Sequence, residues 1–188
     1  MVVHSLNATT SQSLKRWWQI FMDDSKANKC NKFTNMIIAK RTNSKDNDFQ
    51  VLVRELDLDL KIRDGEEHLF YAQLNKTDKI KYVIMVYDQD EPIGCGAVRE
   101  YAADTMEVKR MFVQLKNRGQ GIASIILKEL ETWCKELNFK KCILETGKNQ
   151  PEALRLYTKN NYTITPNFGH YKNVTNSVCF EKELTIDT

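Results

Sequence analysis

A glycine-rich turn between a strand-like run and a long helix-like run constrains the fold of this chain more than any other stretch. The turn is Arg118-Gly119-Gln120-Gly121-Ile122-Ala123. Residues 106–113 before it are rich in apolar and β-branched side chains, and after it apolar side chains recur at helical spacing to residue 137. The glycines let the backbone bend tightly and approach a ligand closely, and the first amides of the helix have no intrahelical acceptor. The pattern therefore predicts a strand–turn–helix unit that can hold a phosphate, with Arg118 adding a positive charge.

Two common phosphate-binding turns do not fit the surrounding sequence. A dinucleotide-binding turn has a third glycine and an acidic residue about 20 positions further on, whereas this chain has Ser124 and Lys141 at those places. A nucleoside-triphosphate loop continues from its last glycine into Lys-Ser or Lys-Thr, whereas Gly121 is followed by Ile122. On this stretch alone, a glycine-softened turn without any ligand remains an alternative.

A second segment narrows the choice among families that have such a glycine-rich turn. Leu144-Glu145-Thr146 is followed by Asn149-Gln150-Pro151 and a run to Tyr157, and the first turn of a helix tolerates a proline at position 151. The Arg-x-x-Gly-x-Ala turn and this segment, in this order and at this separation, resemble the two cofactor motifs of the GNAT superfamily of N-acetyltransferases. The two motifs cover residues 106–162, and a weaker likeness extends from about residue 35 to the end.

The resemblance implies an α+β fold, a three-layer α/β sandwich. Its sheet is expected to be mixed and mostly antiparallel, with helices on both faces and a parallel central strand pair that splays apart. We expect one acetyltransferase domain at residues 35–188, preceded by an N-terminal extension at 1–34. The pattern at 11–26 predicts an amphipathic helix that packs on the domain, with a homodimer or partner contact as the alternative. The apolar face of that helix comprises Leu14, Trp17, Trp18, Phe21 and Met22.

The periodicity of the chain predicts the elements of this domain. Strands are expected at 36–40, 82–87, 93–100, 106–113, 141–145, 162–165 and 177–181, and helices at 49–63, 66–75, 122–137 and from Pro151 onward. Strand 141–145 should run parallel to strand 106–113 in a right-handed βαβ unit. Gly94 and Gly96 indicate a close approach to their strand. The family has a glycine after its tyrosine-bearing helix, whereas this chain has Asn160-Asn161. Asparagine tolerates the left-handed conformation, so we expect the helix to end there.

The resemblance also assigns roles to individual residues. Tyr157 corresponds to the tyrosine that commonly protonates the departing CoA sulfur, and a phenol with an ordinary pKa of about 10 is protonated at neutral pH. Glu107 is a candidate catalytic base or amine anchor, Glu145 is a second candidate carboxylate at the substrate, and a water relay is the third possibility. Alternation along the strand places Glu107 on the same sheet face as Lys109, Met111 and Val113. The expected acetyl-CoA-binding residues are Met111, Phe112, Val113, Arg118, Gly119, Gln120, Gly121, Ile122, Ala123, Ser124, Asn149 and Tyr157.

Composition excludes several other classes of protein. The chain has 188 residues, enough for one domain with a sizeable core, and its net charge of +3 is too mild to indicate nucleic-acid binding. No apolar run approaches about 20 residues, and the N-terminus lacks an apolar leader, so neither a membrane span nor secretion is expected. The five cysteines include no Cys-x-x-Cys pair, and the three histidines lack metal-ligand spacing. We therefore expect a cytoplasmic protein with reduced thiols and no metal.

The sequence leaves the acceptor open. The resemblance implies transfer of an acetyl group from acetyl-CoA to a primary amine, and the absence of an appended targeting module favours a small molecule. The acidic residues between 57 and 67 could face a cationic amine, although a solvated helix face is the simpler interpretation. The alternative function is that of an acyl-CoA-binding sensor or interaction protein with the same fold and no turnover.

Overall fold

A computed structural model of the chain describes residues 37–75, 77 and 80–185. The amphipathic helix expected at residues 11–26 lies outside them. None of the helices in the described ranges is both long and apolar enough to cross a membrane.

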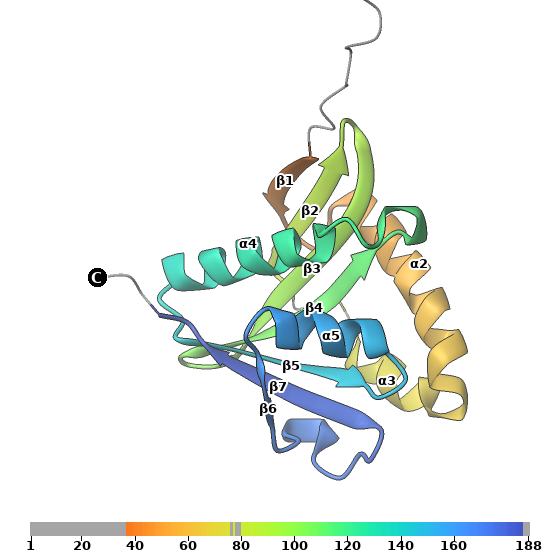
Figure 1. Ribbon diagram of the computed structural model, residues 1–188, viewed down its shortest axis with the longest axis vertical. Coiled ribbons are helices and arrows are strands. Elements are labelled where there is room, and N and C mark those ends of the chain that lie inside the picture. The colour runs from red at the N-terminus through yellow and green to blue at the C-terminus, as the bar shows by residue number, and fades with distance from the viewer. Residues whose placement is uncertain (1–36, 76, 78–79, 186–188) are drawn as a thin grey trace, which may run out of the picture. The chain divides into compact units, whose positions relative to one another are not determined.

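The core of the fold is one seven-stranded mixed sheet with the order β1-β2-β3-β4-β5-β7-β6 (Figure 1). The first four strands form an antiparallel meander, β4 and β5 are parallel, and β7 lies antiparallel between β5 and β6. This arrangement confirms the expected fold class, including the parallel central pair. The strands are β1 (Ile37–Thr42), β2 (Tyr82–Asp88), β3 (Glu91–Ala102), β4 (Thr105–Val113), β5 (Lys141–Gly147), β6 (Thr163–Thr165) and β7 (Ser177–Glu183).

Helices cover both faces of the sheet, as the resemblance implies. The α-helices are α2 (Asn47–Asp64), α3 (His68–Leu74), α4 (Ile122–Glu136) and α5 (Pro151–Lys159). Helices α4 and α5 lie over one face, where Ile126 and Leu130 are fully buried in the larger core cluster (Figure 1). Helix α2 lies on the other face and buries Phe49 and Leu52 in a second cluster. Each helix therefore contributes an apolar stripe to one side of the sheet.

The ends of these helices follow the expected local signals. Asp46 caps α2, because its carboxylate Oδ1 accepts hydrogen bonds from the backbone N–H groups of Asp48 and Phe49 at 3.0 and 3.2 Å. Gly65, with a φ of +54°, ends the helix. After α5 ends at Lys159, Asn161 adopts a φ of +65°, so an asparagine takes the left-handed position where the family has glycine.

The parallel pair separates along its length. Strand β4 pairs with β5 only at Thr105–Glu107, opposite Lys141–Ile143, although both strands continue beyond these residues. The backbone edge of β4 from Val108 to Val113 is therefore free of strand pairing on the β5 side. The expected splay is present, and it opens the sheet beside the glycine-rich turn.

A β-bulge in β4 changes which side chains share a face. Ala97 of β3 pairs with Lys109 and Cys95 pairs with Phe112, so Gly96 faces two residues, Arg110 and Met111. Arg110 has a φ of +58°. The prediction that Glu107 shares a face with Met111 and Val113 is wrong, because the extra residue reverses the alternation: Met111 and Val113 pack on the α4 side.

Gly96 explains how α4 approaches the sheet at this bulge. A Cβ atom at position 96 would lie 2.5 Å from Ile126 Cγ2 and 2.5 Å from Met111 Sδ. No side chain fits that space, so glycine is required by packing. The close approach predicted from the glycines of β3 is confirmed, and the neighbour is helix α4.

Candidate active site

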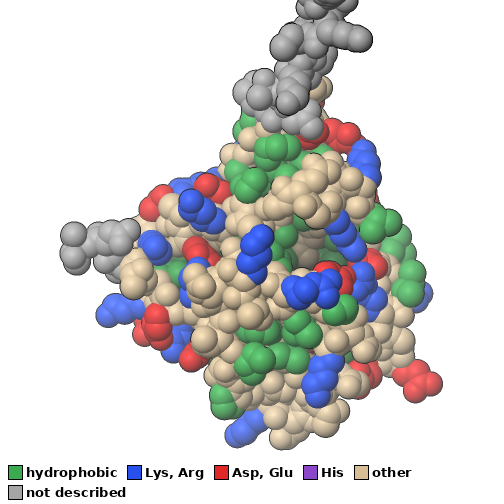
Figure 2. All heavy atoms as spheres, in the orientation of Figure 1, with side chains coloured by type: hydrophobic (Ala, Val, Ile, Leu, Met, Phe, Trp, Pro, Cys, Tyr) green, Lys and Arg blue, Asp and Glu red, His purple; other side chains and the backbone are tan. Residues whose placement is uncertain are grey.

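A groove of about 340 Å³ lies where the end of β4, the start of α4, and helices α5 and α2 come together. It is the larger of two cavities that share the opening between the splayed strands. Figure 2 shows a hollow near the centre of this face of the molecule, with basic side chains gathered around it. The groove is lined by Met111, Phe112, Val113, Asn117, Arg118, Gly119, Gly121, Ile122, Ala123 and Ser124 on the β4–α4 side, by Leu56, Asp59, Leu60 and Arg63 of α2, and by Gln150, Glu152, Ala153, Arg155, Leu156, Tyr157 and Lys159.

The first turn of α4 faces this groove with its backbone. Gly119 and Gly121 have φ values of +77° and +83°, and a Cβ atom at either position would meet no atom within 4 Å. The glycines are therefore needed for backbone conformation and leave the space beside them open. Gly121 is the N-cap, and its carbonyl accepts from the N–H groups of Ser124 and Ile125. A helix start of this kind presents free amides and the positive end of the helix dipole to an anion.

Arg118 lies across the end of β4. Its Nε donates to the carbonyl oxygen of Val113 at 3.0 Å, and Nη2 donates to Asp59 Oδ2 of α2 at 3.3 Å. On α2, Arg63 reaches Glu152 of α5, with Nη1 and Oε1 2.5 Å apart. These ion pairs connect α2 to the turn before α4 and to α5. Arg155 and Lys159 add positive charge to the same lining, which suits a ligand that carries several phosphates.

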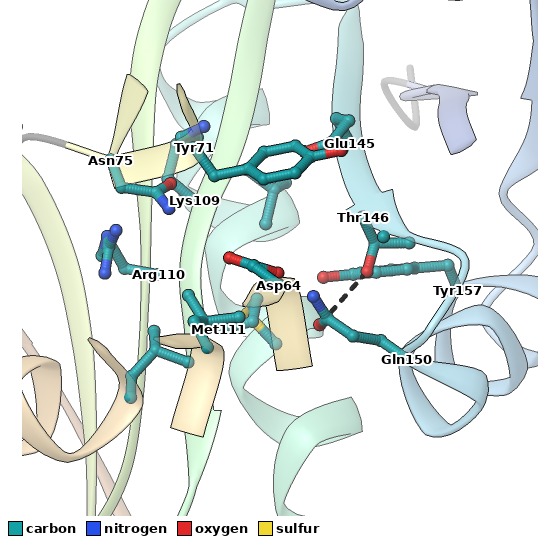
Figure 3. Close-up of a pocket in the computed structure, with 14 residues that line it drawn as sticks. Asp64, Tyr71, Asn75, Lys109, Arg110, Met111, Glu145, Thr146, Gln150 and Tyr157 are labelled. Atoms are coloured by element: carbon teal, nitrogen blue, oxygen red, sulfur yellow. Dashed lines mark hydrogen bonds between the residues drawn. The ribbon is translucent and has the colours of Figure 1, made fainter. Parts of the chain in front are cut away.

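A second, smaller cavity of about 80 Å³ lies beside the groove (Figure 3). The two spaces share the side chains of five lining residues, so they border one another at this point of the fold. The shared residues are Leu56, Leu60, Met111, Gln150 and Tyr157. The smaller cavity is further lined by Asp64, Tyr71, Asn75, Val108, Lys109, Arg110, Glu145, Thr146 and Gly147.

Tyr157 stands at the boundary between the two spaces. The residue is 6% exposed, and its ring packs against those of Tyr162 and Phe180 with centroids 5.8 and 5.7 Å away. Its hydroxyl points into the smaller cavity in Figure 3. Burial raises the pKa of the Tyr157 phenol above its usual value of 10, and the negative charge of Glu145 raises it further. The hydroxyl therefore carries its proton at neutral pH and can donate it.

Glu145, at the end of β5, is the carboxylate that borders the smaller cavity. Its Oε1 accepts a hydrogen bond from Ser177 Oγ at 2.5 Å. Burial raises the pKa of Glu145 to about 7, and the charges of Glu107 and Asp64 act in the same direction, against the opposing effects of Ser177 and Lys109. A carboxyl group with a pKa near neutrality can both accept and release a proton under physiological conditions.

Glu107 is engaged in a buried ion cluster. The residue is 1% exposed, Arg99 Nε donates to its Oε2 at 2.7 Å, and Lys109 Nζ lies 3.3 Å from its Oε1. Lys109 also donates to the hydroxyl of Tyr171 at 3.1 Å. Glu107 lines neither cavity. The geometry therefore gives Glu145, and not Glu107, contact with the space where an acceptor would lie.

The structure brings most of the expected site residues together. Met111, Phe112, Val113, the turn from Arg118 to Ser124 and Tyr157 line the groove, with the exception of Gln120, which is exposed. Asn149 is exposed and lines neither cavity, whereas its neighbour Gln150 lines both and accepts a hydrogen bond from Thr146 Oγ1 at 3.4 Å. Sequence reasoning missed Leu56, Leu60 and Arg63 of α2. It did raise the acidic residues between 57 and 67 as possible partners of a cationic amine, and two of them, Asp59 and Asp64, line the cavities.

Two further features of the described ranges bear on the expectations. The four cysteines within them, at positions 95, 134, 142 and 179, are buried free thiols. No group of three or more His, Cys, Asp or Glu side chains in the same ranges is arranged to hold a metal ion.

Comparison with known proteins identifies the protein family to which this chain belongs. Residues 49–162 match the sequence profile of the acetyltransferase (GNAT) family, so the match covers more than half of the chain. The chain therefore belongs to the GNAT family, and its class of enzyme is an acyltransferase.

Individual relatives agree with this class. Over 96 residues, the chain is 36% identical to the IAA acetyltransferase of Azospirillum brasilense, a match that covers 49% of this chain and 61% of that relative. Among solved structures, a Klebsiella pneumoniae protein assigned as an acyl-CoA N-acyltransferase is 26% identical, with a TM-score of 0.68 over 81% of this chain and 100% of that one. A GNAT family acetyltransferase from Elizabethkingia anophelis, solved with acetyl-CoA bound, is 22% identical, with a TM-score of 0.57 over 80% of this chain and 99% of that one.

Proposed function

We propose that this protein transfers the acetyl group of acetyl-CoA directly to a primary amine on a small molecule. The observation that carries the proposal is the position of Tyr157 between the groove and the smaller cavity, with Glu145 on the acceptor side. A group-transfer enzyme needs two substrates to meet at one point with an acid and a base beside them. These two cavities and these two side chains meet that requirement.

The groove fits the donor. In the proposed complex the pyrophosphate of acetyl-CoA rests on the amides at the start of α4, where Gly119 and Gly121 leave open space. The pantetheine arm follows the backbone edge of β4 that β5 leaves unpaired. A main-chain N–H near Phe112 or Val113 polarises the thioester carbonyl. The acetyl-CoA-bound relative from Elizabethkingia anophelis supports this donor for the fold.

In the proposed reaction, Glu145 acts as the base and Tyr157 acts as the acid. Glu145 accepts a proton from the acceptor ammonium, and the neutral amine attacks the thioester carbonyl carbon to form a C–N bond. As the tetrahedral intermediate collapses, the C–S bond breaks and the Tyr157 hydroxyl donates its proton to the departing thiolate. The nitrogen of the new amide then releases its surplus proton, which restores the Tyr157 phenol. Two observations support Glu145 over Glu107 as the base: its pKa of about 7 and its place in the cavity lining. Glu107 is held by Arg99 and Lys109.

An acceptor screen tests the proposal. The purified protein is incubated with acetyl-CoA and a panel of small primary amines, free CoA thiol is followed over time, and the acetylated product is identified by mass. Thermal unfolding with and without acetyl-CoA is measured in parallel, because a ligand that binds only the folded state raises the melting temperature. Turnover of at least one amine is expected. A shifted melting temperature with no product from any amine would favour the acyl-CoA-binding sensor, and no shift in cofactor-free protein would refute the donor.

A further inference from the structure

A second carboxylate, Asp64, borders the acceptor cavity. It is the last residue of α2, and its side chain is 10% exposed. In Figure 3 its carboxylate points into the space bounded by Tyr71, Met111, Gln150 and Tyr157. The only ion-pair contact of this carboxylate in the described ranges is with His68, whose Nδ1 lies 3.9 Å from Asp64 Oδ2, too far for a hydrogen bond.

Helix stability does not account for an acidic residue at this position. The C-terminal end of a helix carries the negative pole of the helix dipole, which disfavours a carboxylate there and favours basic residues. The last turn of α2 has two basic residues, Lys61 and Arg63, and Arg63 pairs with Asp59 and Glu152 instead of Asp64. Asp64 is therefore a largely buried acid whose one ion-pair contact in the described ranges is long, at 3.9 Å to His68.

The two cations that border the same cavity are neutralised elsewhere. The Arg110 side chain is 1% exposed, and its Nη1 donates to Asp57 Oδ1 at 2.5 Å. Lys109 is held by Glu107 and the Tyr171 hydroxyl. Neither cation lies within ion-pair distance of Asp64 or Glu145. Lys109 and Arg110 thus each have a carboxylate partner outside the cavity lining, whereas Asp64 and Glu145 have no Lys or Arg partner within ion-pair distance among the residues that the structure describes.

Burial makes these unpaired charges unfavourable without a ligand. Burial raises the pKa of Asp64, and the charge of Glu67 adds to this effect against the opposing charges of His68 and Arg63. Glu145 responds to burial in the same way. A buried carboxylate that gains a cationic partner recovers much of this penalty. The cavity is therefore suited to a ligand that brings positive charge to both acids.

We propose that the acceptor is an unbranched amine with two cationic nitrogens, one of which reacts beside Glu145 and Tyr157 while the other binds the carboxylate of Asp64. This inference rests on the proposed function and specifies its substrate class. A volume of about 80 Å³ is far below the roughly 300–1,000 Å³ of a typical ligand site. A space of this size favours a slim alkyl chain over a ring-bearing or branched polyamine.

The role of Asp64 differs from that of Glu145. Once Glu145 has taken the proton from the reacting nitrogen, that nitrogen is neutral and no longer attracts a carboxylate. The second nitrogen keeps its charge throughout the reaction, so its pairing with Asp64 is equally strong in the ground state and the transition state. Interactions of this kind lower KM and leave kcat nearly unchanged. Asp64 is accordingly a specificity-determining residue for binding.

Matched acceptor pairs test this inference. Kinetics are measured with unbranched diamines of two to six carbons and with the monoamine of the same length, for the parent protein and for Asp64→Asn. We expect the parent to prefer the diamine. In Asp64→Asn, the KM for the diamine should rise by about 10–100-fold, the range that a lost charge-assisted hydrogen bond implies. The KM for the monoamine and the kcat for both should change much less.

A matched charge control distinguishes the effect of a carboxylate inside the cavity from the effect of the net charge of the protein. Glu66→Gln removes one negative charge two residues away, at an exposed position that does not line the cavity. It should leave the diamine preference intact. Asp64→Glu keeps the charge and should retain part of the preference. The acetyl-CoA-induced rise in melting temperature shows for each variant that the fold and the groove are preserved.

The outcomes distinguish this inference from the proposed function. A parent enzyme that acetylates monoamines as well as diamines, or an Asp64→Asn variant with equal losses for both, would overturn the inference and leave the acetyltransferase function standing. A protein that acetylates no amine would overturn both. Calorimetric titration of a diamine into the CoA-loaded protein supplies a readout apart from turnover: binding by the parent that weakens in Asp64→Asn is expected, and unchanged binding refutes the role of Asp64.

Discussion

Glu145→Gln should make the protein more stable while it slows catalysis. The carboxyl has an ordinary pKa of 4.5 and a pKa of about 7 in the folded protein, where burial is the largest cause. Between these two values the folded state binds more protons than the unfolded state, so stability falls as the pH rises. The full penalty is present above about pH 7 and absent below about pH 4.5. The glutamine has nearly the same shape, can still accept from Ser177 and never ionises.

The gain in stability expected for Glu145→Gln follows from the difference between the folded and unfolded pKa values of Glu145. A difference of about 2.5 pKa units corresponds to about 3 kcal/mol, since one unit is worth about 1.4 kcal/mol. For a chain of this length, each kcal/mol moves the melting temperature by roughly 2–4 °C. At about pH 8, Glu145→Gln should therefore melt roughly 6–12 °C above the parent. At about pH 4.5 the two melting temperatures should differ by no more than about 1–2 °C, because the glutamic acid is then protonated in the folded state and half protonated in the unfolded state.

The same variant reports on catalysis. If ionised Glu145 is the base, the kcat/KM of the parent should rise about tenfold between pH 6 and pH 8, as the ionised fraction grows from about one tenth to about nine tenths. Dividing parent by variant rates cancels the titration of the acceptor amine, and this ratio should titrate near pH 7. Calorimetric unfolding and initial rates across the same buffers measure both effects. A variant less stable than the parent at about pH 8, or a ratio of rates that does not depend on pH, would refute the reasoning.

Three further changes have defined outcomes. Tyr157→Phe should lower kcat by about 10²–10⁴ with little change in the affinity for acetyl-CoA, and an unchanged single-turnover rate would remove the proton donor from its role. Gly121→Asp should abolish the rise in melting temperature caused by acetyl-CoA while the fold survives, because a carboxylate then lies where the pyrophosphate is proposed to bind; normal binding would locate the cofactor elsewhere. Gly96→Ala should destabilise the fold by about 1–3 kcal/mol in urea unfolding, since its methyl group would collide with Ile126 and Met111.

Local patterns predicted the turn and the helix that line the proposed donor groove. The positive φ values at Gly119 and Gly121 are ones that glycine adopts without strain, so the sequence identifies the turn directly. The helical spacing after residue 121 then fixes the direction of α4 and of the amides at its start. Asn161 illustrates the same principle at the end of α5, where a tolerant residue type marks a left-handed position.

The acceptor side depends on contacts between distant parts of the chain, which no local pattern contains. Asp59, Arg63 and Asp64 are charged residues on a helix, and in sequence they are indistinguishable from a solvated surface. They reach the site only because α2 lies over the sheet face that carries Phe112. The pKa of Glu145 is similarly a property of its neighbours Ser177, Lys109 and Asp64, which are 32, 36 and 81 positions away in the sequence.

The bulge at Arg110 accounts for both the wrong face prediction for Glu107 and the charge of the acceptor cavity. One extra residue in β4 turns Met111 toward α4, while Lys109 and Arg110 are held on the other side by Tyr171 and Asp57. Glu107 is thereby paired with Arg99 and Lys109, and Arg110 is paired separately with Asp57. With these charges occupied, the carboxylates of Asp64 and Glu145 are the ones left to meet an acceptor. A strand of regular alternation would instead bring Glu107 to the face of Met111, and the proposed preference for a dication would then have no structural basis.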